Sequence, residues 1–365
     1  FPLRLFFFLG WMSALIGSGF WIFSSSLPIL EHSRILTGGF LFGYSTGFLL
    51  TAVPVFLDSD RPNRMLVGIA ASFLMASTVA ASYSAMTFFH VFFLAAILVI
   101  ILTLALCFRT RKNQLPPFFA FVALGFLSAI VSNFIFAFSI NSYSLPALAR
   151  VLLFEGIILS FVVGIGSRIL PVIFGYRDSV LRSKTSQQPK LDWHIISGVT
   201  LFAVSFLIEV YLSVFVGRLL RAILLISLAF GPLKLYRLPR SKGVVPVFVW
   251  VAMWSLVIGQ FGNALSNQSI AWLHLTFIAG FSLMTLMIAL HVLVEREQLE
   301  PRLEKSSNMI FISAILLFGA AIVRFFGTAT GNLQISYLRI AALLWIGSFC
   351  LWLVALAFNR SRSAE

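Results

Sequence analysis

Twelve apolar runs, each about as long as a bilayer is thick, make up most of the sequence, and only short polar breaks separate them. A helix that crosses the hydrocarbon core takes roughly 20 predominantly apolar residues. The sequence therefore predicts twelve spanning helices and leaves no room for a separate soluble catalytic domain. The expected spans are 5–27, 35–57, 65–83, 87–108, 117–140, 147–174, 193–213, 215–234, 244–266, 270–293, 308–328 and 335–358.

The composition agrees with this interpretation. Hydrophobic residues make up 60% of the chain and charged residues 10%, whereas a soluble domain is about 25% charged. The expected fold is an all-α, polytopic membrane helical bundle that forms a single transmembrane domain over residues 1–365. Cys107 and Cys350 lie inside apolar runs, so we expect them to be buried small hydrophobes rather than a disulfide.

The net charge of +14 would suggest a nucleic-acid partner in a soluble protein. In a membrane protein, cytoplasmic loops carry an excess of Lys and Arg. Alternate breaks, beginning with the amino end, contain nineteen of the 26 basic residues, and the longest of these breaks is 176–192. The distribution predicts that both termini are cytoplasmic, and it requires no nucleic acid.

The seven remaining basic residues are all arginines, and we expect them inside the membrane or at its edge. Six lie near the outer ends of spans and Arg168 lies near an inner end, while Glu31, Glu155 and Glu209 fall at the outer level. Either the arginines pair with these carboxylates and snorkel to headgroups, or an acidic ligand balances the surplus charge. The seven are Arg34, Arg150, Arg168, Arg218, Arg221, Arg324 and Arg339.

The five histidines separate into two levels. His32, His90 and His274 open different spans near the outer face, whereas His194 and His291 lie near the inner face. Haem needs one or two axial imidazoles and cations for its propionates. We expect His32 and His274 to ligate haem iron, with His90 as a spare ligand. The expected propionate partners are Arg34, Arg150, Arg324 and Arg339.

Motifs for catalysis are sparse. The sequence contains no HExxH, no GxSxG, no phosphate-binding glycine loop and no cysteine pair at metal-binding spacing. The sequence therefore names no reaction, and it favours binding over turnover without deciding between them.

Four segments resemble the NnrS family of bacterial inner-membrane proteins, which contain haem and copper and are associated with tolerance of nitric oxide. They are the opening Pro2–Phe8, the run from His32 to a GFLLTAVP segment that ends at Pro54, GSRILP at 166–171, and a segment from His274 to Thr285. The resemblance implies b-type haem, a multi-pass protein of the inner membrane, and a role in binding, sensing or electron transfer linked to nitric oxide or respiratory stress.

The sequence departs from the family pattern at several candidate metal ligands. Arg34, Ile35 and Leu36 stand where the family has a second histidine followed by Glu and Met. The family histidine of the ninth span is replaced within 250–254, His291 aligns with an arginine, and a last histidine near 295–297 is absent. The resemblance therefore implies haem for this chain and leaves copper binding open.

The span count also resembles the catalytic subunit of haem-copper oxidases, in which the second and tenth helices hold the low-spin haem. Spans 2, 6 and 10 each carry a family motif, which is consistent with a four-helix unit used three times. The oxidase's copper-site histidines and tyrosine helix have no counterpart here, which argues against oxygen reduction. Fold analogy by itself does not give function.

Two other functions stay open at this point. A secondary transporter for an anionic solute would use the outer arginines, and glycine-rich segments such as 38–43 and 164–166 are typical of transporter helices. A non-catalytic scaffold subunit of a membrane complex would tolerate the loss of ligands. The expected partners are the lipid bilayer, haem, and a membrane redox partner or complex subunits.

Overall fold

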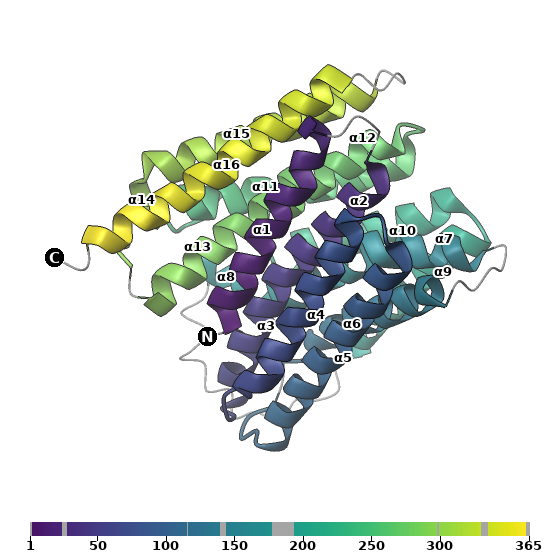
Figure 1. The fold of residues 1–365 in the computed structure, drawn as a ribbon, viewed down its shortest axis with the longest axis horizontal. Coiled ribbons are helices and arrows are strands. Elements are labelled where there is room, and N and C mark those ends of the chain that lie inside the picture. Colours follow the sequence, from purple (N-terminus) through teal and green to yellow (C-terminus); the bar gives the residue numbers. More distant parts are fainter. Residues whose placement is uncertain are drawn as a thin grey trace. The chain divides into compact units, whose positions relative to one another are not determined.

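The computed structural model describes residues 2–23, 28–114, 116–138, 144–176, 193–297, 299–329 and 335–362, which form helices and connecting turns without a strand (Figure 1). The expected linker at 176–192 lies, apart from Tyr176, outside these residues. The helices are α1 (Pro2–Phe23), α2 (Ile29–Arg34), η1 (Ile35–Leu41), α3 (Phe42–Leu57), α4 (Arg64–Ser82), α5 (Met86–Arg109), α6 (Phe119–Ala137), α7 (Leu145–Val151), η2 (Leu152–Gly156), α8 (Ile157–Ile173), α9 (Trp193–Tyr211), α10 (Val214–Phe230), α11 (Val244–Leu265), α12 (Ser269–His274), η3 (Leu275–Ser282), α13 (Leu283–Glu297), α14 (Arg302–Ser306), α15 (Asn308–Ala329) and α16 (Ile335–Arg362).

Eleven helical segments in the described part of the chain are long and apolar enough to cross a membrane. They correspond to eleven of the twelve expected spans. The remaining one, expected at 215–234, is α10, whose 17 residues stand at the short end of the range for a span. The prediction of an all-α polytopic membrane bundle is confirmed.

The chain divides into two compact units. Unit 1 comprises 1–17, 28–169 and 178–220, and unit 2 comprises 18–27, 170–177 and 221–365. The prediction of one transmembrane domain over 1–365 stays a prediction.

In the described part of the chain three spans contain a π-helix, and these are the second, sixth and tenth in chain order. Each has the same plan of a short α-helix, a π-helix and a longer α-helix: α2, η1 and α3; α7, η2 and α8; α12, η3 and α13. They are also the most enclosed spans, with 72–78% of their apolar windows buried against 22–61% in the others. A π-helix frequently marks a functional position, and the spacing of four spans favours the threefold repeat. By contrast, α8 runs unbroken through Gly164 and Gly166.

The second and sixth spans also end alike. In α3, the Pro54 carbonyl accepts a bond from the Ser59 amide, and Asp58 between them is left-handed with φ 47°. In the sixth span the Pro171 carbonyl accepts from the Tyr176 amide, and Gly175 has φ +72°. The left-handed residue reverses the chain, so that the amide of the next residue donates to a carbonyl in the last turn of the helix that would otherwise lack a partner.

Beyond this end, Tyr176 anchors the following turn of unit 2. Its hydroxyl donates to the carbonyls of Arg237 at 3.0 Å and Leu238 at 3.1 Å. Burial raises the pKa of Tyr176, so the phenol stays a proton donor at neutral pH.

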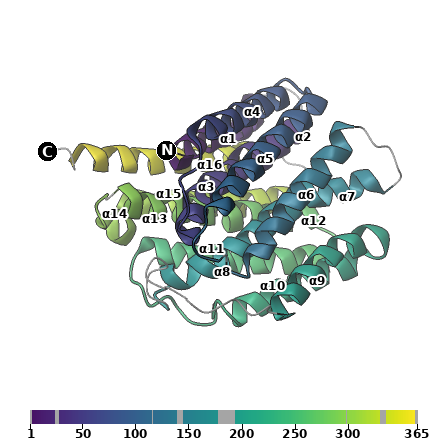
Figure 2. The ribbon, with the colours of Figure 1, turned by 90° about the horizontal axis from the view of Figure 1, so that it is seen from below.

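Within unit 1, local sequence signals set where the helices begin. Asn63 caps α4, because its Oδ1 accepts from the amides of Met65 at 2.8 Å and Leu66 at 3.4 Å. Helices α4 and α5 pack along each other (Figure 1), and α6 lies against α7 and η2 (Figure 2). These contacts bring α2, α5 and α6 together around the polar side chains described below.

Within unit 2, α11 approaches α12 and η3 closely because two glycines face them. A Cβ at Gly259 would collide with Thr276, and one at Gly262 would collide with the Trp272 ring. Helices α15 and α16 pack together through reciprocal hydrogen bonds, in which the Ser313 hydroxyl donates to the Ser348 carbonyl at 2.9 Å and the Ser348 hydroxyl to the Ser313 carbonyl at 2.7 Å. Such small, polar contacts are typical of membrane helix pairs.

Candidate functional site

His32 lies on α2, three residues before Ile35, where the π-helix of the second span begins. Its Nδ1 is 2.9 Å from the carbonyl oxygen of Gly17. Because a carbonyl oxygen only accepts, Nδ1 carries the proton and the lone pair of the ring is on Nε2. The neighbouring Glu31 accepts a 2.6 Å bond from the Ser84 hydroxyl.

Arg34, His90 and Asn133 form a hydrogen-bonded chain inside unit 1. The Arg34 Nε is 3.2 Å from His90 Nε2, and His90 Nδ1 is 2.8 Å from Asn133 Oδ1. The Asn133 Nδ2 donates to the Ala129 carbonyl at 2.8 Å, which fixes the orientation of the amide. An arginine only donates, so His90 accepts at Nε2 and donates from Nδ1. Both nitrogens of His90, the expected spare haem ligand, are engaged by side chains.

The buried guanidinium of Arg34 has no carboxylate within 4 Å among the described residues. It lies over the Phe136 ring, with Cζ 5.6 Å from the centroid, and the His90 ring stacks on the same phenylalanine at 4.7 Å. Arg150 on α7 is exposed, and its charge, like that of Glu31, acts on Arg34. The structure thus associates Arg34, His90 and Arg150 from the expected set.

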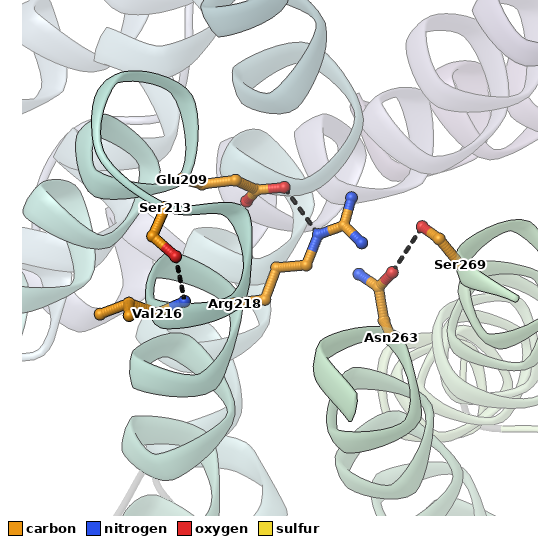
Figure 3. Close-up of polar contacts among 6 residues, drawn as sticks. All are labelled: Glu209, Ser213, Val216, Arg218, Asn263 and Ser269. Atoms are coloured by element: carbon orange, nitrogen blue, oxygen red, sulfur yellow. Dashed lines mark hydrogen bonds and ion pairs between the residues drawn. The ribbon is translucent and has the colours of Figure 1, made fainter. Parts of the chain in front are cut away.

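One of the expected pairings between arginine and glutamate is formed in unit 1 by Arg218 and Glu209. The Arg218 Nε is 2.8 Å from Oε1 of Glu209, as Figure 3 shows, and Ser213 caps this start of α10 by accepting from the Val216 amide at 3.3 Å. Glu155 in η2 is buried, with 4% of its surface exposed. Arg168 lies in α8, partly buried.

In unit 2, His274 is the last residue of α12, directly before η3. Its Nδ1 is 2.7 Å from the Ile270 carbonyl oxygen, so its lone pair, like that of His32, is on Nε2. The start of α12 is tied to the end of α11 by the Ser269 hydroxyl, which donates to Asn263 Oδ1 at 2.7 Å (Figure 3). The Trp272 ring packs on Phe325 of α15 at 4.8 Å. His274 is therefore held on a fixed turn.

Arg324 and Arg339 differ in environment, although the sequence placed both at the same level. Arg324 on α15 is 7% exposed, its Cζ lies 5.2 Å from the Trp21 ring centroid, and its Nη1 has no hydrogen-bond partner in the described part of the chain. Arg339 on α16 is exposed. Of the two, only Arg324 is a buried cation.

His291 on α13 lies between two carboxylates. Its Nδ1 is 2.8 Å from Glu304 Oε1 and its Nε2 is 3.6 Å from Glu295 Oε1. Both ring nitrogens of His291 therefore face carboxylate acceptors, which suits a protonated imidazole with an N–H donor at each nitrogen. This environment suits the position at which the family resemblance aligns an arginine.

No group of three or more His, Cys, Asp and Glu side chains converges on a point within the described ranges. The comparison with known families is decisive for identity, because the model of the NnrS protein family matches residues 1–359. The chain belongs to the NnrS family. No curated protein matches it.

The NnrS match confirms the resemblance drawn from the short motifs, and all three π-helices lie in spans that carry those motifs. Three residues that contact the candidate groups were missed by the sequence analysis, namely Asn133, Phe136 and Trp21. A lone amide inside an apolar run was the available signal for Asn133, because polar side chains at membrane depth are costly. Nothing in the sequence distinguishes Phe136 and Trp21 from the other aromatic residues.

Proposed function

We propose that this multi-pass NnrS-family protein binds b-type haem, with His32 and His274 as axial ligands to the iron. The observation that carries the proposal is the orientation of the two rings. Each has its Nδ1 at a backbone carbonyl, 2.9 Å for His32 and 2.7 Å for His274. Metal-binding histidines almost always donate their second N–H in this way, which fixes the tautomer and raises the basicity of the ligating nitrogen.

His90 and His291 have other partners at their ring nitrogens. His90 is engaged by Arg34 and Asn133, and His291 faces two carboxylates. His194 is exposed near the start of α9. The five histidines thus fall into different environments, and the same two that the sequence favoured have the orientation expected of ligands.

The charges of the chain suit a group with propionates. Arg34 and Arg324 are both buried and have no carboxylate within 4 Å among the described residues. Guanidinium groups bind carboxylates bidentately. In the proposal Arg34 and Arg324 pair with the haem propionates. The more exposed Arg150 and Arg339 are additional partners for the same carboxylates.

A reduced-minus-oxidised absorption spectrum of the purified protein tests haem binding. We expect α and Soret bands of b-type haem that are lost or shifted in His32→Ala and in His274→Ala. His194→Ala is the matched control and should leave the bands unchanged. Absence of haem absorption, or bands that both ligand variants leave intact, would contradict the proposal.

Bound haem would supply an iron that takes up an electron or a diatomic ligand, and we place the protein in the nitric-oxide or respiratory stress response by binding, sensing or electron transfer. Family membership supports this role. Titrating the reduced protein with nitric oxide should shift the Soret band at micromolar concentration. If the spectrum does not respond, direct binding and sensing of nitric oxide by the haem fail, whereas haem binding and a role in electron transfer stand.

We further propose an inner-membrane location with both termini cytoplasmic, on the basis of the loop charges. A reporter that is active only in the cytoplasm should be active when it is fused to either end of the chain, and a reporter that is active only in the periplasm should be inactive at both ends. A periplasmic signal from either end would contradict this orientation.

A second candidate function is transport of an anionic solute. The π-helical break at Gly38 and Gly39 inside the second span, together with buried Arg324, favours it, because transporters bind solutes at interrupted helices. Anion uptake by proteoliposomes containing haem-free protein would support transport. Copurification of stoichiometric partners with neither haem nor uptake would instead identify a scaffold subunit.

A further inference from the structure

The hydrogen-bonded chain from Asn133 to Arg34 has a single direction. Asn133 Nδ2 donates to a backbone carbonyl, so its Oδ1 is the acceptor for His90 Nδ1. His90 Nε2 in turn accepts from Arg34 Nε. Asn133 is 0% exposed and His90 is 2% exposed, so water does not compete for these bonds. The chain fixes the edge of the guanidinium that carries Nε.

The opposite edge of the Arg34 guanidinium has no fixed partner. Among the described residues neither Nη atom makes a hydrogen bond, and the residue is 9% exposed. The group that holds Nε is a neutral imidazole, so the hydrogen bond does not compensate the positive charge. Contact with the Phe136 face at 5.6 Å offsets part of the desolvation. A charge that is largely buried without a counter-ion is costly, so an anion bound at this edge would stabilise the arginine.

The charges around Arg34 also favour binding of an anion. Arg150 on α7 contributes a second positive charge to the surroundings of Arg34. The Glu31 carboxylate accepts a bond from the Ser84 hydroxyl rather than from Arg34. Arg150 is exposed, so its guanidinium is accessible to a ligand.

We propose that Arg34 and Arg150 form a binding site for an oxyanion, with His90 and Asn133 as positioning residues that hold Arg34. The ligand is a carboxylate or phosphate group, because the two Nη atoms of a guanidinium form a planar fork that matches such oxygens. His90 acts through Arg34 and does not touch the anion. The site does not require haem, and its test uses haem-free protein.

The test measures binding of inorganic phosphate to the full-length protein in a neutral detergent. Thermal unfolding is followed while phosphate replaces chloride at constant ionic strength. We expect the melting temperature to rise with phosphate in a saturable manner. Arg34→Gln should weaken the apparent affinity by about tenfold or more, which is the effect of losing one charge-assisted contact, and Arg34→Lys should also weaken it because the bond to His90 is lost.

Two further variants separate positioning from general charge effects. His90→Gln retains an acceptor for Arg34 and should bind phosphate as the unmodified protein does, whereas His90→Leu should bind it more weakly. Arg64→Gln removes an exposed arginine of the same unit and should change nothing. The proposal is overturned if phosphate stabilises no more than chloride, if Arg34→Gln binds normally, or if Arg64→Gln loses as much affinity. Normal binding by His90→Leu would overturn the positioning role.

Competition identifies the source of the oxyanion. If haem displaces phosphate and haem dimethyl ester does not, the natural ligand is a propionate. Displacement by phosphatidylglycerol in nanodiscs, with phosphatidylcholine as control, identifies a lipid phosphate. If neither haem nor phosphatidylglycerol displaces phosphate, the natural ligand is a free anion. Each of these outcomes supports the site, and failure of the haem spectrum leaves it standing.

Discussion

Arg34 donates its Nε–H to Nε2 of His90 across 3.2 Å, and this contact sets the protonation of the imidazole. With Nε2 as acceptor, His90 is neutral and donates from Nδ1 to Asn133 at 2.8 Å. The bond joins α2 to α5, and the next one joins α5 to α6. A residue that the sequence suggested as a spare haem ligand is thus a link between three helices.

Removing the imidazole should destabilise unit 1. We expect His90→Leu to lower the free energy of unfolding by about 2 kcal/mol, because it leaves Arg34 and Asn133 without partners in a buried environment. His90→Gln should lose less, since its side-chain carbonyl can accept from Arg34. Denaturant unfolding in detergent measures the free energy of unfolding of both variants. His194→Gln, at an exposed histidine, is the control. Equal losses for Leu and Gln would show that the acceptor does not matter.

The close approach of α11 and α12 should depend on the absence of a side chain at Gly262. A Cβ there meets the Trp272 ring, so we expect Gly262→Ala to destabilise the protein by about 1–3 kcal/mol. Gly319 on α15 has no heavy atom of the described structure within 4 Å of such a Cβ, so Gly319→Ala should stabilise the helix by up to about 1 kcal/mol. Thermal unfolding of both variants measures the difference. The same sign of change for both would contradict the contact with Trp272.

Hydropathy alone predicted the spans well, because every helix that crosses a bilayer must bury roughly the same length of apolar surface. It placed the second span at 35–57, whereas the helical segment begins at Ile29. Glu31, His32 and Arg34 therefore lie inside the helix rather than before it. An apolar scan excludes these residues because their polar partners come from distant segments, as in the bond from His32 to the Gly17 carbonyl.

The environment of the arginines could not be predicted from the sequence. Arg324 and Arg339 were assigned to one level, but one is 7% exposed and the other is exposed. Lipid-facing and core-facing positions carry similar apolar neighbours, so hydropathy does not separate them. The π-helices were also not predictable, because their wider turns depend on packing against other helices.

The paired serines of α15 and α16 should couple energetically. The two hydroxyl oxygens lie 3.1 Å apart, and either alanine variant removes this contact. The bond from each hydroxyl to the other residue's carbonyl, at 2.9 Å and 2.7 Å, is lost only in its own variant. A double-mutant cycle of Ser313→Ala and Ser348→Ala should give a coupling energy of about 0.6–1.7 kcal/mol, the range found for membrane helices. Refolding equilibria in mixed detergent give the four free energies. Additive losses would mean that the two hydroxyls act independently.

Two buried amides of the NnrS-family chain should respond in opposite ways to the same substitution. Gln260 on α11 is 1% exposed, and neither Oε1 nor Nε2 has a hydrogen-bond partner in the described ranges. Asn133 on α6 is 0% exposed and uses both amide atoms. Burying an amide without a hydrogen bond costs about 1–3 kcal/mol, so Gln260→Leu should stabilise the protein by an amount in that range.

Asn133→Leu is the matched control for Gln260→Leu, because it removes an amide whose bonds are satisfied and leaves the His90 Nδ1–H without an acceptor. We expect it to lower the free energy of unfolding by about 1–3 kcal/mol. Both variants are measured by thermal unfolding of haem-free protein, so that ligand binding does not contribute. If Gln260→Leu destabilises as much as Asn133→Leu, then Gln260 is hydrogen-bonded in the membrane, and the difference between the two amides is contradicted.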